Sequence, residues 1–260
     1  MSGPYGRRSY VDSLATADDT VVALWGGHAL LRPMPDGSGL DAATAYPLGG
    51  FDAVVDLEEG LAALRSAGAV SLAVVADPLN APDLHRRLKT HYILDRSVGA
   101  YAPSKHHRYE IRRAQRQVTV DRVALPSTME QWRRLYDHLA DRHAIGPARL
   151  TPRHFDALAA DPQALVLAAR LAGDAAGASY ALYAAAIEEL ATCRLLDLGG
   201  MPGLTDDPSH GLARFKRGFC NAERATWLSG FVLDRARYED AVTTAGADGP
   251  GGFFPAYRAR

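Results

Sequence analysis

The chain has 260 residues, a formal net charge of −1 and 47% hydrophobic residues, a balance typical of a globular protein. This balance excludes a chain that is basic overall, and two cysteines, Cys193 and Cys220, exclude a fold held by several disulfides. No apolar run approaches the roughly 20 residues that cross a bilayer, and no signal segment is evident. We therefore expect a cytoplasmic protein that does not bind membranes.

The first part of the chain predicts strands interspersed with helices, after about 18 residues that we expect to be poorly ordered. In chain order we expect a strand pair over 21–35 that turns at Gly26-Gly27, a helix over 57–68, a strand over 69–77, a short helix over 81–91, a strand over 91–97, a basic helix over 104–117 and a strand over 118–125.

The second part opens with Ser127 and Glu130, which fit a capping box for a helix that ends near His143. After it we expect a short helix from Thr151-Pro152, two antiparallel strands over 164–186 that turn at Gly173-Asp174, a strand over 190–200, a helix over 211–222 and a strand over 225–234.

This order of elements predicts an α+β fold with mixed β-sheets flanked by helices. The two halves have similar patterns, although no exact sequence repeat joins them. We therefore expect two units of one kind packed together, residues 1–125, which include the basic helix, and residues 126–260.

The stretch GLARFKRGF contains one of only three lysines, whereas the chain has 29 lysines and arginines together. At about 100° per residue, Leu212, Phe215 and Phe219 share one helix face, and Lys216 lies at its margin beside Leu212 and Cys220. One interpretation is a lysine whose stem is buried while its ammonium stays in water. The other is a point charge aimed into a cleft, where it stabilises a developing oxyanion.

Before this helix, the expected strand ends in Gly199-Gly200, where glycines let a ligand or another backbone approach closely. A phosphate cradle at the helix N-terminus is one interpretation, but Asp206 and Asp207 oppose a pyrophosphate. The alternative is a glycine-rich turn in which an Asp or Ser caps the helix.

The helix over 104–117 is strongly basic, with Glu110 as its only acid. Its cations repel each other at helical spacing unless a polyanion such as an RNA backbone, or nearby acids, neutralise them. RNA binding and a solvated helix face are both open interpretations. The cations are Lys105, Arg108, Arg112, Arg113 and Arg116.

The sequence has no spacing of His, Cys or carboxylates that indicates a metal site, and no nucleophile motif such as Gly-x-Ser-x-Gly. We therefore expect neither a metal nor a covalent intermediate. Asp137, Asp141 and His143 could form a polar patch in a cleft, or simply a helix end.

Three segments together resemble the FemABX family of aminoacyl-tRNA-dependent transferases, which are built on two acetyltransferase-like (GNAT) units. They are the aromatic and glycine loop over 44–51, the basic segment over 101–120, and the LLDLGG and GLARFKRGF motifs, with the last the most specific. The resemblance covers about residues 20–240, and it implies that each half is one GNAT-like unit.

The resemblance implies that an amino acid passes from the end of a tRNA to an amine, with aminoacyl-tRNA as co-substrate and no other cofactor or DNA. Phe215 and Lys216 match the family's Phe-Lys pair, so Lys216 would stabilise the charge on the ester carbonyl while Phe215 supplies backbone and packing. We expect tRNA contacts from the five basic-helix cations with Arg214 and Arg217, and substrate contacts from Trp25, Tyr46, His143, Asp197, Gly199 and Gly200.

The chain is shorter than most cell-wall members of the family and shows no coiled-coil arm, which favours a small-molecule acceptor, as in antibiotic tailoring. An acetyl-CoA-dependent transferase of the same fold is the main rival, although the nearest string to its nucleotide loop, at Arg65–Val70, ends a helix instead of opening one. A wall-precursor transferase and a non-catalytic RNA-binding protein are further alternatives.

Overall fold

The structure, a computed structural model, describes residues 3–45, 56–146, 149–171, 177–201, 206–247 and 253–259. The chain forms two compact units. Unit 1 comprises Met1–Leu88, Leu150–Ala157 and Thr226–Arg260, and unit 2 comprises Lys89–Arg149 and Leu158–Ala225. Each compact unit is thus built from segments that are separated in the sequence. The assignment of residues 1–125 and 126–260 to two GNAT-like units stays a prediction.

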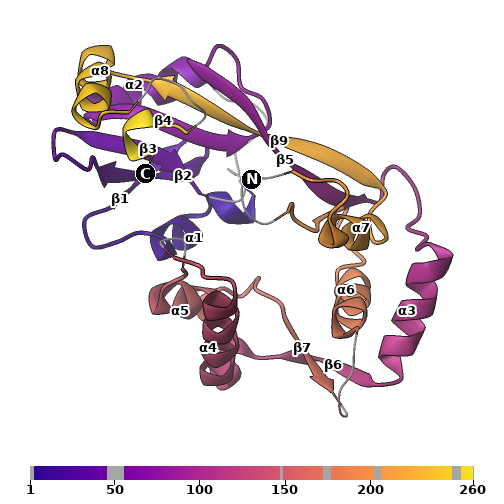
Figure 1. Cartoon of the computed structure of the whole chain (residues 1–260). Helices are drawn as coiled ribbons and strands as arrows, with labels where there is room; N and C mark the ends of the chain where they lie inside the picture. Colours follow the sequence, from indigo (N-terminus) through magenta and orange to yellow (C-terminus); the bar gives the residue numbers. More distant parts are fainter. Residues whose placement is uncertain are drawn as a thin grey trace. The chain divides into compact units, whose positions relative to one another are not determined.

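Figure 1 shows the helices and strands along the chain. The helices are α1 (Arg8–Ser13), α2 (Leu57–Ser66), α3 (Lys105–Gln115), α4 (Leu125–Arg142), α5 (Pro152–Ala160), α6 (Ala178–Glu189), α7 (Gly211–Arg217) and α8 (Arg235–Thr244), with short 3-10 turns at Pro4–Gly6 and Ala256–Arg258. The strands are β1 (Thr20–Leu24), β2 (Gly27–Pro33), β3 (Leu40–Thr44), β4 (Ala69–Ala76), β5 (Leu84–Asp95), β6 (Val118–Val123), β7 (Val166–Leu171), β8 (Leu195–Asp197) and β9 (Ala222–Val232).

The strands of the larger sheet follow the order β1-β2-β3-β4-β9-β5-β8, and β6 pairs with β7 in a separate sheet. The larger sheet is mixed, because β3 and β4 are parallel whereas β1–β2, β2–β3, β4–β9 and β5–β8 are antiparallel. The predicted α+β class with a mixed sheet flanked by helices is therefore confirmed. Among the described residues, no helix combines the length and apolar character that a membrane span requires.

In unit 1, helices cover both faces of the sheet (Figure 1). α2 and α8 pack on the face that carries Val70, Leu72 and Val74 of β4. On the opposite face, Val11 of α1 packs in one cluster with Leu30 of β2. This contact holds α1 in place, so the expectation of poor order was wrong for residues 3–18, the part of this segment that the structure describes.

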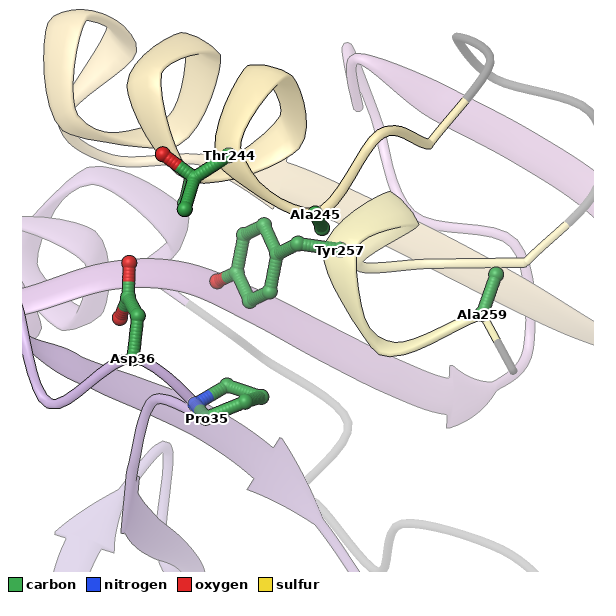
Figure 2. Close-up of a pocket in the computed structure, with 7 residues that line it drawn as sticks. Pro35, Asp36, Thr244, Ala245, Tyr257 and Ala259 are labelled. Atoms are coloured by element: carbon green, nitrogen blue, oxygen red, sulfur yellow. The ribbon is translucent and has the colours of Figure 1, made fainter.

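The C-terminal end of unit 1 is fastened to β3 through a buried carboxylate. Asp41, 3% exposed, accepts hydrogen bonds from the hydroxyl groups of Tyr257 and Ser71 and from Nε of Arg258. Burial, followed by the charge of Asp41, raises the pKa of Tyr257 and keeps its hydroxyl a donor. Figure 2 shows Tyr257 at the edge of a cavity of about 190 Å³ beside α8. None of the expected site residues lines this cavity.

In unit 2, α7 is held by aromatic side chains from two other helices. Tyr180 and Tyr183 of α6 each lie 4.9 Å from the ring of Phe215, measured between ring centroids. His107 of α3 packs 5.1 Å from the ring of Phe219, and its Nε2 donates to the carbonyl oxygen of Phe215 at 3.0 Å. α3, α6 and α7 therefore share one core, which fixes the rotation of α7 about its axis.

Two predicted elements were wrong. Residues 84–95 form strand β5 where a helix was expected over 81–91, because sheet pairing outweighs the helix propensity of the arginines and leucines at its start. The second strand expected within 164–186 is helix α6, whose alanine-rich sequence has high helix propensity. The turn expected at Gly173-Asp174 lies outside the described residues.

Helix boundaries also differ from the prediction at α4. The helix begins at Leu125 with Pro126 in its first turn, and its N-cap is Ala124, which makes no side-chain cap. Ser127 lies inside the helix and donates to the carbonyl oxygen of Ala124 at 2.9 Å. The capping box was therefore wrong, because proline at the helix start places the N-terminus earlier. Helix α8 and strand β3 were not predicted at all.

We expect Phe219→Ala to lower the free energy of unfolding by about 3–5 kcal/mol, because the Phe219 side chain is fully buried at the centre of the aromatic core. Urea denaturation followed by circular dichroism measures the change. Leu135→Ala, at a position that is 63% exposed in the same unit, is the control and should shift stability by less than about 0.5 kcal/mol. Equal effects at the two positions would contradict this account of the core.

Candidate functional site

Lys216 is buried in unit 2, with 7% of its surface exposed. α7 turns the side chain inward, and Nζ donates a hydrogen bond of 2.7 Å to the carbonyl oxygen of Gly200. The aromatic residues on the neighbouring face of α7 set this orientation. Most of the side chain is therefore inside the protein, and the ammonium binds a carbonyl oxygen of the protein, whereas the ammonium of a snorkelling lysine would extend into water.

A second buried lysine lies beside it. Lys89 of β5 is 4% exposed, and its Nζ donates a hydrogen bond of 2.9 Å to the carbonyl oxygen of Met201. Two of the three lysines in the chain thus bind consecutive carbonyl oxygens, those of Gly200 and Met201. Burying two like charges is costly unless hydrogen bonds and opposite charges compensate, so the pair marks a specialised site.

The glycine pair makes room for these side chains. Gly199 has φ +77°, a left-handed conformation that favours glycine, and a Cβ atom there would lie 3.4 Å from Nζ of Lys216. A Cβ on Gly200 would lie 3.0 Å from Cδ of Lys89 and 3.2 Å from Cδ2 of His91. The expected close approach at Gly199-Gly200 is thus present, and the approaching groups are the protein's own side chains and the backbone carbonyl of Thr90.

Two carboxylates accept hydrogen bonds from residues next to Lys89 and in the glycine pair. Asp197 accepts hydrogen bonds of 2.7 Å from the backbone N–H of Gly199 and from Nδ1 of His91. Asp206 accepts from the backbone N–H and the hydroxyl of Thr90, at 3.0 and 2.9 Å. Asp197 thereby places a negative charge near Lys216, and backbone donors hold both acids in place.

Burial lowers the pKa of Lys216 below the ordinary lysine value of 10.5. Asp197 acts in the opposite direction and raises this pKa, whereas the charge of Lys89 lowers it further. A cation in such surroundings interacts strongly with any charge that develops close to it, because little water screens it. The arrangement is therefore chemically suited to stabilise an oxyanion.

The start of α7 is capped by the chain itself. His210, where an Asp or Ser was expected, is the N-cap, and its side chain accepts from the N–H of Leu212 at 3.1 Å. Asp207 accepts from the backbone N–H of Ser209 at 2.8 Å. These contacts favour the interpretation as a capped turn over a phosphate cradle, because the protein occupies donors that a phosphate would need.

The two arginines expected to bind tRNA from α7, Arg214 and Arg217, have different surroundings. Arg214 is exposed on α7. Arg217 instead binds within the unit: Nε lies 2.8 Å from the carboxylate of Glu223, Nη1 donates to the carbonyl oxygen of Pro208, and the guanidinium lies over the ring of Tyr92. Arg214 is therefore the better placed of the two to meet a ligand.

The basic helix is confirmed as α3, and its five cations are all exposed. Arg113 makes an ion pair of 3.7 Å with Glu110, and Arg108 donates to the carbonyl oxygen of Pro103. Through His107 and Phe215, α3 also contacts α7, which carries Lys216. Whether these cations bind RNA stays a prediction.

The remaining expected site residues lie apart from Lys216 or outside the described residues. Trp25 belongs to unit 1, where its indole N–H donates to the carbonyl oxygen of Asp56 at 2.9 Å and its ring packs against Gly60 of α2. His143 is exposed at the end of α4. Tyr46 lies outside the described residues. A substrate contact at any of these positions stays a prediction.

Lys89 and His91 are the two site residues that sequence reasoning missed. The helix expected over 81–91 concealed them, because it gave no reason to place their side chains against Gly200. One signal was present: the scarcity of lysine, which drew attention to Lys216, applies equally to Lys89.

Within the described ranges, no group of three His, Cys, Asp or Glu side chains could hold a metal ion. A cavity of about 290 Å³ in unit 2 lies between α4, α6 and the β6–β7 sheet, and its lining is mostly apolar, with Trp132 and Leu135 among it. None of the expected site residues lines that cavity either.

Gly200→Ala should lower the free energy of unfolding by about 1–3 kcal/mol, because the new methyl would lie 3.0 Å from the rigid carbonyl oxygen of Thr90. Gly146→Ala is the matched control, since nothing lies within 4 Å of a Cβ there, and it should change stability by less than about 0.5 kcal/mol. Chemical denaturation of the two variants tests the packing of the glycine pair. A Gly200→Ala variant as stable as the control would contradict it.

No protein-family model and no curated protein matches the sequence. Solved structures do match. FemX aligns with a TM-score of 0.61 at 12% identity over 91% of this chain and 94% of that one. L-PGS from Bacillus licheniformis aligns with a TM-score of 0.57 at 16% identity over 84% and 85% of the two chains.

The C-terminal domain of a proposed lysylphosphatidylglycerol synthetase from Agrobacterium fabrum aligns with a TM-score of 0.55 at 16% identity, over 86% of this chain and 89% of that one. At such identities the similarity concerns the fold. The protein therefore has the GNAT-like fold of these structures, as its sequence predicted, while membership of the FemABX family stays a prediction.

Proposed function

We propose that the protein is an aminoacyltransferase that moves an amino acid from aminoacyl-tRNA to an amine of a small-molecule acceptor, in the cytoplasm and without a further cofactor. The buried ammonium of Lys216, held against the Gly199-Gly200 turn, is the observation that carries the proposal. The fold supports the proposal. FemX shares its name with the FemABX family of aminoacyltransferases, and the other two structures reported above bear the name of an enzyme that makes lysylphosphatidylglycerol.

The chemistry requires little from the protein. An aminoacyl ester is already activated, so its aminolysis needs a neutral amine, correct positioning and a group that stabilises the oxyanion of the tetrahedral intermediate. Lys216 supplies a single compact positive charge for that oxygen. The N–H groups and carbonyls around Gly199 and Gly200 are rigidly held, which limits the reorganisation that the site needs during the reaction.

Lys89 strengthens this assignment. Its charge lies close enough to Lys216 to lower the pKa of that lysine, so the two ammonium groups together make the region around Gly200 favourable for negative charge. Neither position has an arginine, although arginine is the common cation of this chain. Lysine suits both buried positions, because the guanidinium of an arginine has five N–H donors and some of them would lack acceptors there.

An acetyl-CoA-dependent transferase is less well supported. Arg65 and Ser66 end α2, and the turn at Gly68 leads into strand β4 at Ala69. A nucleotide loop of the acetyltransferase kind needs the reverse order, a strand followed by a helix. A wall precursor as acceptor, and RNA binding without catalysis, are the remaining alternatives that the experiments below distinguish.

The decisive experiment incubates the protein with charged tRNA and candidate amines, with and without ribonuclease, and in parallel with acetyl-CoA. Amide formation that ribonuclease abolishes supports the proposal, whereas transfer from acetyl-CoA alone overturns it. Binding of tRNA with no product from any donor or amine indicates the non-catalytic alternative. Small amines and a wall-precursor peptide, offered separately, identify the class of acceptor.

Lys216→Ala should leave folding intact and reduce turnover by about 10²-fold or more, as loss of an oxyanion donor does. Because burial lowers the pKa of Lys216, the charged form disappears as the pH rises through that lowered value, so turnover of the unaltered protein should fall at a pH below 10.5. Exposed Arg134 provides the control variant Arg134→Ala, which should retain turnover. Unchanged turnover in Lys216→Ala would exclude the catalytic role.

Neutralising Arg112 and Arg113 together should weaken tRNA binding and lower the slope of log affinity against log salt by about 1 to 2, because two phosphate contacts are lost. Arg134→Ala with Arg142→Ala removes the same charge from exposed positions of α4 and serves as the matched control. Filter binding at several salt concentrations gives both slopes. A binding constant that does not depend on salt would show that α3 is only a solvated face.

A further inference from the structure

The pair of His91 and Asp197 has no part in the function described so far. Nδ1 of His91 lies 2.7 Å from Oδ2 of Asp197, and the other carboxylate oxygen is held by the N–H of Gly199. Since a carboxylate accepts, the hydrogen bond assigns the proton of the neutral ring to Nδ1. The second ring nitrogen, Nε2, then carries an available lone pair.

Nε2 of His91 has no hydrogen-bond partner among the residues that the structure describes. The imidazole is nevertheless 97% buried, with 3% of its side chain exposed. Among the described residues, the buried side-chain nitrogens and oxygens that lack both solvent and a partner belong to Arg32, Arg133 and Ser229. Nε2 of His91 is not one of these atoms.

The free nitrogen lies beside the proposed oxyanion site. Cδ2 of His91, the ring atom bonded to Nε2, is 3.2 Å from the Cβ position of Gly200. The carbonyl oxygen of that same glycine accepts from Nζ of Lys216. A potential base and a cation thus border one residue, and an acyl transfer uses one group that takes a proton and another that stabilises the oxygen.

We propose that His91, oriented by Asp197, is the general base of the acyl transfer. The proposal rests on the function proposed above and names the group that handles the proton. The amine lone pair forms the C–N bond while Nε2 of His91 takes one amine proton. The C–O bond of the ester then breaks, its electron pair goes to the ribose oxygen, and His91 returns the proton to that oxygen. The products are an amide and a free hydroxyl, and the histidine is neutral again.

The charges around His91 suit a base that takes up a proton and releases it. Asp197 on β8 stabilises the protonated ring, whereas Lys216 on α7 and Lys89 on β5 border the same glycine and disfavour it. Asp206 accepts from the hydroxyl of Thr90, whose side chain points to the opposite face of β5 from His91.

Kinetics provide the first test. His91→Gln should reduce kcat by about 10²- to 10⁴-fold and remove the fall of kcat at acid pH that protonation of the base causes. Asp197→Asn should shift that acid limb without abolishing it, because the ring loses its orienting charge but keeps Nε2. The matched control is His138→Gln, at an exposed histidine of α4, with no change expected. An acid limb that persists unchanged in a folded His91→Gln variant would overturn the proposal.

Nitrogen NMR of the unaltered protein provides a second test that needs no substrate and no folded variant. At pH 8 the His91 ring should carry its proton on Nδ1 and show an unprotonated Nε2. A proton on Nε2 would overturn the assignment, because that nitrogen could not then act as the base. Transfer that resists ribonuclease would overturn only the proposal that tRNA carries the donor. The role of His91 is decided separately, by its tautomer and by the pH profile measured with whichever donor supports transfer.

Discussion

A buried ammonium group must be surrounded by acceptors, because its transfer from water is costly unless hydrogen bonds and opposite charges replace its hydration. In this protein that requirement is met for Lys216 by the carbonyl oxygen of Gly200, and the arrangement of the residues around the Gly199-Gly200 turn follows from it. The turn favours glycine at position 199 because φ is +77°, and at position 200 because a Cβ there would lie 3.0 Å from Cδ of Lys89 and from the carbonyl oxygen of Thr90. Asp197, held by the N–H of Gly199, supplies the opposite charge.

The same requirement explains why α7 needs firm support. A helix of seven residues has little stability of its own, so packing must hold it. Phe215 and Phe219 anchor it to α6 and α3, and Gly218 lets α3 come close, since a Cβ there would collide with the ring of His107. The helix that carries the exposed cations is thereby connected to the helix that carries Lys216.

Sequence reasoning succeeded where the local pattern and the tertiary environment agree. The apolar stripe of GLARFKRGF correctly placed a helix with Lys216 at the margin of its buried face, and the basic run correctly placed α3. It failed for β5, where local propensity and the final strand partner disagree, and for α6, where a strand was expected although the alanine-rich sequence favours a helix. Arg86 and Arg87 are compatible with a helix, but the strand is stabilised by neighbours that are distant in the chain, and this information is absent from a short window.

By itself, the sequence determined the α+β class, the basic helix and the unusual status of Lys216, because composition and 3.6-residue periodicity are local properties of the chain. Only the tertiary structure decided that Lys89 and His91 meet Gly200, some 110 residues further along the chain. The rotation of α7 and the strand pairing of β5 bring those side chains together, and both depend on packing between distant segments. The candidate base and the second buried cation therefore became visible only once the strand and the turn were in place.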